Sequence, residues 1–112
     1  MEPTMEALGG LTLIVLPGPN LDASNAKTFR KEVAPLLEGR TQVLFDLSKV
    51  DFMDSSGLGA VLSCLRTVSG ASGQLCLCSM TKPVRSLFEL VRMHRVFDIY
   101  NTRDEAARAM KA

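Results

Sequence analysis

The chain has 112 residues and a mass of 12.2 kDa, a length that suits one domain around a single hydrophobic core. Hydrophobic residues make up 46% of it and charged residues 22%, a globular composition that excludes a mainly disordered chain. Thirteen basic and twelve acidic side chains leave a formal net charge of +1, so the excess of cations that holds nucleic acid is missing. We therefore expect one domain over residues 1–112 and no nucleic-acid partner.

The cysteine content and the absence of targeting signals favour a cytoplasmic protein. The start MEPTMEALGG lacks a basic region followed by an apolar stretch, and no run reaches the ~18 apolar residues of a membrane span. Three cysteines, Cys64, Cys76 and Cys78, cannot all pair within one chain, so we expect them to fill core space in a reducing compartment. With a single histidine, His94, and no CxxC pair, the ligands of a zinc site are lacking. We expect no membrane partner, no metal and no cofactor.

The first third of the chain predicts a hairpin and then a helix. Residues 11–16 (LTLIVL) form an apolar, β-branched run typical of a central strand buried on both faces. Residues 4–8 predict an edge strand, joined to it by a Gly9-Gly10 turn. Apolar residues then recur with helical spacing from Ala26 to Leu37, with Asp22 or Ser24 available as the helix cap. We expect Pro35 to bend this helix or weaken its last turn.

The remaining chain alternates between strands and helices. Strands are predicted at residues 43–47, 74–78 and 96–100, and residues 48–54 read as a turn. Helical stripes of apolar residues separate or follow these strands, at Leu58, Val61, Leu62, Leu65 and Val68, at Val84, Leu87, Phe88 and Val91, and at Ala106, Ala107 and Met110. Such alternation predicts an α/β fold with a mainly parallel central sheet of four to five strands and about four helices.

The segment most open to function is FMDSSGLG, residues 52–59. It follows a predicted strand and opens a helix, which is where α/β sheets place ligands. Ser55 or Ser56 is the expected N-cap, with its hydroxyl group at the surface. Gly57 and Gly59 allow close approach of either the sheet or a visiting protein. Taken alone, a serine before a helix is usually only a cap.

Catalysis by this chain is not expected. The GxxxxGK[ST] pattern of a P-loop and the GxSxG pattern of a hydrolase elbow are both absent. A serine nucleophile also needs a positioned base, and the only histidine, His94, falls near the end of the third predicted helix.

The segment FDLSKVDFMDSSGLG, residues 45–59, resembles the signature of STAS domains, specifically that of the bacterial anti-sigma factor antagonists. The resemblance extends over nearly the whole chain, through LPG at residues 16–18, Leu21-Asp22, VRSLFEL at residues 84–90 and Val96-Phe97. It implies a STAS fold and a partner-switching role. In that role the unphosphorylated protein binds a serine kinase that doubles as an anti-sigma factor, and phosphorylation by the kinase releases it.

The resemblance also implies which residues act. The phosphorylated residue of the family corresponds to Ser55, and Ser56 corresponds to the neighbouring hydroxyl residue that is not the target. A phosphatase acting on phosphorylated Ser55 is a further implied partner. The residues implied to bind the partner are Asp22, Asp54, Ser55, Ser56, Gly57, Leu58 and Gly59.

Two departures from the family pattern stand out. The segment Gly18–Asp22 is one residue longer than the common form, and Arg92 stands where many members have a helix-ending glycine. Two alternatives also remain open at this point. One is a STAS subunit of a transporter or a larger signalling assembly, and the other is a small domain that binds a phosphate ligand, or acts on it, at the same helix N-terminus.

Overall fold

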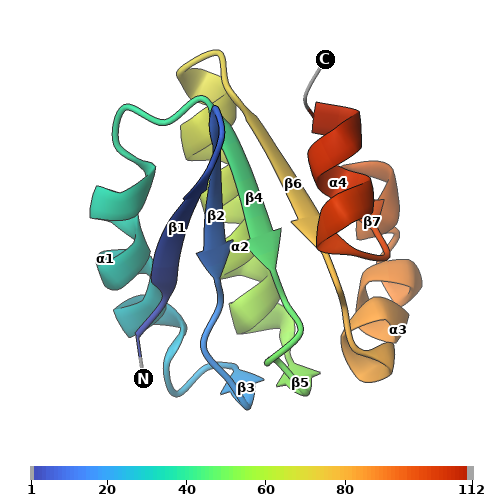
Figure 1. Ribbon diagram of the computed structural model, residues 1–112. Helices are drawn as coiled ribbons and strands as arrows, with labels where there is room; N and C mark the ends of the chain where they lie inside the picture. Colours follow the sequence, from blue (N-terminus) through green and yellow to red (C-terminus); the bar gives the residue numbers. More distant parts are fainter. Residues whose placement is uncertain (1, 111–112) are drawn as a thin grey trace.

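The computed structural model describes residues 2–110 and confirms the α/β class. Its main sheet has five strands in the order β1 (Thr4–Leu8), β2 (Leu11–Val15), β4 (Gln42–Asp46), β6 (Gln74–Cys78) and β7 (Asp98–Tyr100). Only β1 is antiparallel to its neighbour (Figure 1). Leu8 pairs with Leu11 across the Gly9-Gly10 turn, and Gly9 has a φ of +65°, as the predicted hairpin requires. A second, two-stranded parallel sheet joins β3 (Asn20–Leu21) to β5 (Phe52–Met53).

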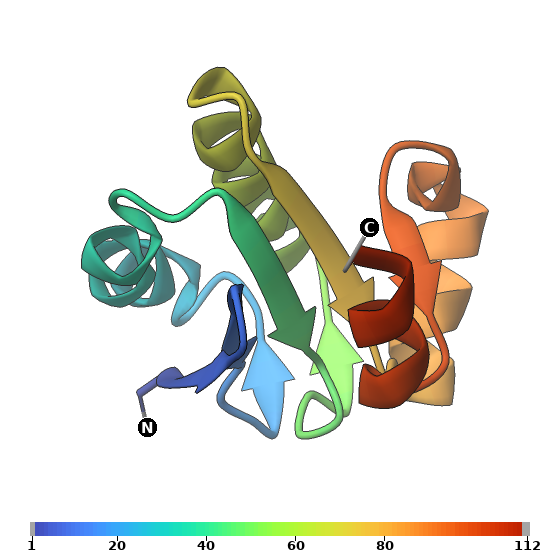
Figure 2. The same cartoon turned by 45° about the horizontal axis from the view of Figure 1, so that its top comes forward.

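The helices lie on both faces of the sheet. The described residues form α1 (Ala26–Leu37), α2 (Ser55–Gly70), α3 (Lys82–Leu90) and α4 (Arg103–Met110), with a short 3-10 helix, η1 (Met93–Arg95). α1 continues through Pro35, as expected from its apolar face. α4 alone covers the opposite face from α1, α2 and α3 (Figure 2). No helix within residues 2–110 has the length and apolar character needed to cross a membrane.

Strand alternation divides the core between these two faces. Ile14, Phe45 and Leu77 face the α1–α3 side, where the rings of Phe29 and Phe45 meet edge to face with centroids 6.4 Å apart. Their neighbours along the strands, such as Leu13, Leu44 and Cys76, face α4 instead. Both faces of the central strands are therefore buried, which is why their sequences are continuously apolar.

A single charged side chain among the described residues is buried, and it anchors α4. Asp46, only 2% exposed, accepts hydrogen bonds from Arg103 Nε at 2.5 Å and from the Ser48 backbone N–H at 2.8 Å. Burial raises the pKa of Asp46, but the hydrogen bonds from Ser48 and Arg103 outweigh it, so its pKa lies below the ordinary value. The first turn of α4 is thus tied to the carboxyl end of β4.

Several details differ from the sequence-based expectations. On α2, Cys64 rather than Leu65 fills the core. Val61, Cys64 and Val68 lie on one face of the helix, because they are three and four residues apart, and Leu65 is half-buried beside that face. Val91 is exposed because α3 ends at Leu90. The last strand begins at Asp98 and leaves Val96 50% exposed.

The expected core role of the cysteines is confirmed. All three are free and buried, and Cys76 and Cys78 lie on the α4 side of the sheet. Burial raises the pKa of the Cys64 thiol to about 12 and that of the other two to about 11. Thiols with such pKa values carry almost no thiolate at neutral pH and are poor nucleophiles.

Arg92 occupies the left-handed backbone region that favours glycine. Its φ is 61° and its ψ is 26°, immediately after α3 and before η1. A residue with a Cβ atom is disfavoured there by roughly 1–2 kcal/mol. Glycine lacks this cost but loses more backbone freedom on folding.

We expect Arg92→Gly to raise the free energy of unfolding by up to about 1 kcal/mol, since removal of the Cβ clash outweighs the added entropy of the unfolded chain. Urea denaturation of the two proteins measures the difference. Arg92→Ala is the matched control: it removes the long side chain and retains Cβ, so its stability should stay close to that of the parent. An equal gain in both variants would assign the effect to the arginine charge instead of the backbone.

Candidate functional site

The candidate site lies where the chain leaves β2 and β4, beneath the carboxyl ends of these strands in Figure 1. The two loops that follow are joined to each other: Pro19 C=O accepts from the N–H groups of Asp51 and Phe52 at 2.6 and 3.2 Å. The Thr81 hydroxyl, at the start of α3, donates to Val50 C=O at 2.7 Å. The segment predicted as a turn at residues 48–54 therefore contains a strand, β5, and is held from two sides.

Asp54 is the N-cap of α2, so the expectation that Ser55 or Ser56 caps the helix was wrong. Asp54 has the extended backbone of a cap residue, and its Oδ1 accepts from the Gly57 N–H at 3.0 Å. Its Oδ2 accepts from the Ala23 N–H at 3.1 Å. One carboxylate thereby joins the N-terminus of α2 to the loop between β3 and α1.

Ser55 and Ser56 are the first two residues of α2, and both are exposed. Among residues 2–110, neither hydroxyl group takes part in a hydrogen bond. Amide groups in the first turn of a helix lack intrahelical acceptors and create a partial positive charge. The hydroxyl groups are thus presented to solvent at a helix end that favours an anion.

The two glycines of the loop have different surroundings. A Cβ atom at Gly57 would lie 2.1 Å from the Leu21 carbonyl oxygen, so this glycine is required by the close approach of β3. A Cβ atom at Gly59 would meet nothing within 4 Å, and Gly59 is exposed. Leu58, between them, is buried in the core. The sequence suggested that these glycines allow close approach of either the sheet or another protein. The first explanation holds for Gly57, and the surface at Gly59 is open to another molecule.

Asp22 lies in the neighbouring loop, and its carboxylate is bound within that loop. It accepts from the Ser24 hydroxyl at 2.6 Å, the Ser24 N–H at 3.0 Å and the Asn20 side-chain amide at 2.7 Å. These bonds, first of all the one from the Ser24 hydroxyl, hold the pKa of Asp22 below its ordinary value. α1 itself begins after Asn25 with no side-chain cap, because the side chains of Asp22 and Asn25 stabilise the preceding turn.

Phe52 lies within the predicted segment 52–59, but sequence reasoning did not predict that its side chain is exposed. Its side chain is 54% exposed on β5, and Met53, the next residue, is buried. Both side chains are apolar, so the sequence alone does not indicate which of the two faces solvent. The exposed Ala23, brought to Asp54 by tertiary structure, was missed.

The chemistry available at this surface is limited. No cationic side chain lies within residues 52–59, and His94 lies in η1, beyond the far end of α3 from Thr81. No group of three potential metal ligands occurs among the residues that the structure describes. The arrangement offers exposed hydroxyl groups on a fixed backbone.

The STAS domain family model matches residues 2–106, which include every residue of this site. The chain belongs to the STAS domain family. Bordetella bronchiseptica BtrV, assigned by name to the anti-sigma factor antagonists, is 31% identical over 112 residues, which cover 99% of this STAS domain and 96% of BtrV. The Paenibacillus polymyxa anti-sigma F factor antagonist is 26% identical over 103 residues, or 90% and 87% of the two chains.

A solved structure agrees with this assignment. The crystal structure of a Thermotoga maritima protein, also designated an anti-sigma factor antagonist, has a TM-score of 0.86 and 26% sequence identity. The match covers 98% of this STAS domain and 95% of the Thermotoga chain. The fold predicted from the FDLSKVDFMDSSGLG motif is therefore confirmed.

The capping geometry predicts that two adjacent residues contribute very differently to stability. Asp54→Ala removes the acceptor for the Gly57 and Ala23 N–H groups and should lower the free energy of unfolding by about 1–2 kcal/mol. Ser55→Ala removes no hydrogen bond within the domain and should change it by less than about 0.5 kcal/mol. Thermal denaturation measures both, and Asp54→Asn, which retains one acceptor oxygen, should fall between them. A larger loss in Ser55→Ala than in Asp54→Ala would contradict this assignment of the cap.

The glycines offer a second matched pair. Gly57→Ala forces Cβ against the backbone of Leu21, so we expect a loss of about 1–3 kcal/mol. Gly59→Ala places the same methyl group in open space within a helix, where alanine is preferred by up to about 1 kcal/mol. Denaturant unfolding of both variants tests the opposite signs. Equal effects would mean that α2 does not approach β3 as closely as described.

Proposed function

We propose that this STAS domain is a cytoplasmic anti-sigma factor antagonist that acts by binding. In its unphosphorylated form it binds an anti-sigma factor serine kinase, and phosphorylation of Ser55 by that kinase releases it. The observation that carries the proposal is the exposed, unbonded hydroxyl of Ser55 at the start of α2, in a domain related to anti-sigma factor antagonists. A phosphatase that removes the phosphate would return the domain to its binding form.

The position of Ser55 favours its phosphorylation. Ser55 and Ser56 are both exposed, and the family pattern distinguishes them, because the target is the hydroxyl residue directly after the aspartate of DSSGLG. Asp54, the residue before Ser55, accepts two hydrogen bonds from backbone N–H groups, which hold the start of α2 in place beside the neighbouring hydroxyl. A kinase would find this hydroxyl without unfolding the domain.

The same position explains why the fold would survive phosphorylation. A phosphate adds about −1.5 to −2 charges. The helix N-terminus stabilises an anion through its free amides and its dipole. Because the Ser55 hydroxyl makes no hydrogen bond within residues 2–110, modification breaks none there. The consequence of phosphorylation should therefore lie in binding.

Release would follow from the charge that the interface would have to bury. The new phosphate would lie beside the Asp54 carboxylate, and residues 52–59 contain no cation to pair with it. The Asp22 carboxylate, in the adjoining loop, adds a further negative charge, and the hydrogen bonds from Ser24 hold its pKa below the ordinary value. Burying an unpaired phosphate against a partner costs several kcal/mol, enough to turn a covalent change into dissociation.

The partner surface would combine this switch with an apolar anchor. Phe52 is the exposed aromatic residue of the site, and aromatic residues dominate the binding energy of many interfaces. Gly59, on the first turns of α2, is exposed and leaves space for another molecule. The buried Gly57 and Leu58 would support this surface by packing beneath it. The hydrogen-bonded carboxylates of Asp22 and Asp54 would make it negatively charged.

Two substitutions of Ser55 separate binding from folding. Ser55→Ala should keep the melting temperature and the affinity for the kinase, and it should accept no phosphate. Ser55→Asp should also keep the melting temperature, because a carboxylate suits the helix N-terminus. It should bind the kinase at least about tenfold more weakly, since its charge must be desolvated beside Asp54. Calorimetric titration against the kinase, with melting curves and phosphopeptide mapping, measures all five effects.

Ser56→Ala is the matched control. It should bind the kinase and be phosphorylated as the parent is. Label that persists in Ser55→Ala and is lost only in Ser56→Ala would show that Ser56 is the target. Equal affinity of Ser55→Ala and Ser55→Asp for the kinase would contradict release by charge at this position. A large loss of stability in Ser55→Asp would attribute its weak binding to misfolding.

A further inference from the structure

Apolar side chains are exposed together where α3 ends. Among residues 2–110, five large hydrophobic side chains are exposed, and three of them lie within residues 90–96, here called the α3 corner. Leu90 is 80% exposed, Val96 50% and Val91 43%. Figure 2 shows this orange segment at the edge of the sheet that carries β7, opposite β1. Single exposed apolar residues are ordinary, whereas a contiguous group of them indicates an interaction surface.

The α3 corner also carries positive charge. Arg92 and Arg95 are exposed, and neither makes an ion pair or a side-chain hydrogen bond within residues 2–110. The exposed His94 lies between them. The segment itself contains no acidic residue, although Glu89 and Asp98 flank it. Apolar area beside unpaired arginines is complementary to an acidic partner.

The α3 corner is ordered before any partner binds. The N–H groups of Val96 and Phe97 both donate to Met93 C=O, at 3.0 and 3.1 Å. At the base of the corner, the buried rings of Phe88 and Phe97 meet edge to face with centroids 5.7 Å apart. A surface that is already ordered loses little conformational entropy when a partner docks on it.

Arg92 occupies its position at a cost to folding. Its φ of 61° lies in the region that favours glycine, which is why we expect Arg92→Gly to stabilise the domain. A residue held in such a conformation is often found at a functional position. Here it places an arginine between the exposed end of α3 and η1. A role in binding would account for an arginine where glycine folds better.

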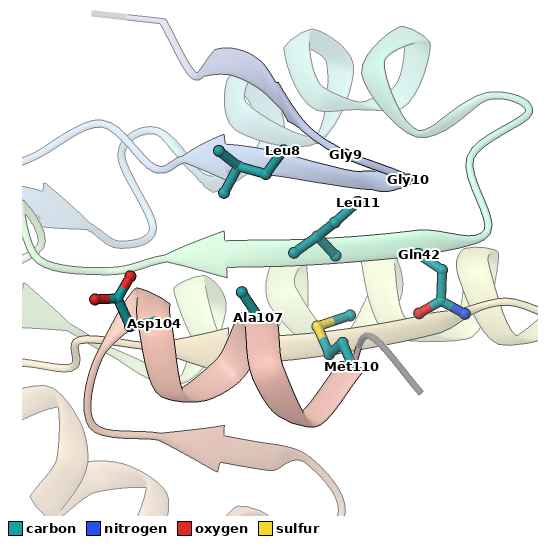
Figure 3. A pocket seen from close by; sticks show the side chains of 8 residues that line it. All are labelled: Leu8, Gly9, Gly10, Leu11, Gln42, Asp104, Ala107 and Met110. Carbon is teal, nitrogen blue, oxygen red and sulfur yellow. The ribbon is translucent and has the colours of Figure 1, made fainter.

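A second apolar surface of the domain lacks these cations. An open cavity of about 560 Å³ lies between α4 and the turn that joins β1 to β2 (Figure 3). Leu8, Leu11 and Met110 supply apolar parts of its wall, and among residues 2–110 no basic residue lines it. Of these two surfaces, the α3 corner is the one whose charge indicates a partner.

We propose that the α3 corner binds a short acidic segment of a partner protein, in which carboxylates flank apolar side chains. The carboxylates pair with Arg92 and Arg95, and the apolar side chains pack on Leu90 and Val96. These groups are unpaired or exposed in the domain alone, so the contact breaks no ion pair within residues 2–110.

Two other occupants suit the α3 corner less well. Anionic membranes attract clusters of about four to eight Lys and Arg residues, and the corner has two arginines. A second copy of the domain would have to present its acidic surface around Phe52 and Asp54 to the corner. That head-to-tail contact would cover the Ser55 surface and extend into rings or filaments.

The α3 corner lies away from the Ser55 surface. α3 starts beside that surface, where the Thr81 hydroxyl donates to Val50 C=O. Its nine residues then rise about 13 Å before the corner begins. A partner can therefore dock at the corner whether or not Ser55 is modified, and the inference does not rest on the proposed switch.

The test titrates the full chain with a synthetic acidic peptide, DELLED, blocked at both ends, and follows the backbone amides by two-dimensional NMR. We expect saturable shifts at Leu90, Arg92 and Val96 and none at Ser55. The neutral peptide NQLLQN should bind at least about fivefold more weakly, and about 0.5 M salt should weaken DELLED binding by a similar factor. DEAAED, which has small side chains in place of leucine, should bind at least about threefold more weakly.

Substitutions that leave the fold intact locate the contact. Arg92→Gly should weaken DELLED binding about two- to fivefold while the melting temperature rises, two effects that a misfolded variant would not combine. Arg95→Gln should weaken binding by a similar factor, whereas Arg66→Gln removes the same charge from an exposed position on α2 and should leave it unchanged. Leu90→Ser should weaken binding, and Met5→Ser, at an exposed apolar residue on β1, should have no effect.

Several results would overturn the proposal. Equal binding of DELLED and NQLLQN would remove the acidic partner, and shifts centred outside residues 88–97 would remove its place. Sedimentation with phosphatidylserine vesicles tests the membrane, and vesicle binding that Arg92→Gly abolishes would assign the α3 corner to lipid. Self-association that Arg92→Gly abolishes would assign it to a second copy. Ser55→Asp should bind DELLED as the parent does, so this test and that of the Ser55 switch can fail separately.

Discussion

The candidate site depends on the two hydrogen bonds of one carboxylate. Asp54 Oδ1 caps α2 through the Gly57 N–H, and Asp54 Oδ2 holds the Ala23 N–H of the loop before α1. Gly57 is part of the same constraint, since any side chain there would separate α2 from the Leu21 carbonyl. These contacts fix the start of α2 against β3. Ser55 is therefore exposed on a helix end that is held in place, which is the combination that a modification site on a folded domain needs.

This arrangement separates the stability of the domain from its charge. The groups that hold the helix end are Asp54 and the backbone of Gly57, whereas the proposed switch is the neighbouring hydroxyl, which makes no bond within residues 2–110. Had Ser55 been the cap, as its sequence position suggested, phosphorylation would have removed a cap and loosened α2. With Asp54 as the cap, a phosphate changes the electrostatics of the surface and leaves the hydrogen bonds of the helix in place.

The two faces of the sheet differ in how many helices cover them. Three helices pack on the face that carries Ile14, Phe45 and Leu77, and this packed face supports the start of α2. The other face has α4 alone, anchored through the ion pair of Arg103 with the buried Asp46. Since so short a helix does not cover the hairpin, an open cavity lined by Leu8, Leu11 and Met110 remains there. The Ser55 surface and this cavity thus belong to separate parts of the domain.

The amino-acid sequence by itself determined the order of strands and helices, because apolar runs and helical spacing are local signals that packing in this fold reinforces. It also predicted the segment DSSGLG as the candidate site, through a motif whose residues are contiguous. Tertiary structure decided what each residue there does. Asp54 rather than Ser55 is the cap, Gly57 rather than Gly59 is sterically required, Ala23 joins the site, and Phe52 is exposed there. These outcomes depend on contacts between backbone groups that are distant in sequence and lie together at the ends of β3 and β5. Composition and periodicity are local properties, so they do not predict such contacts.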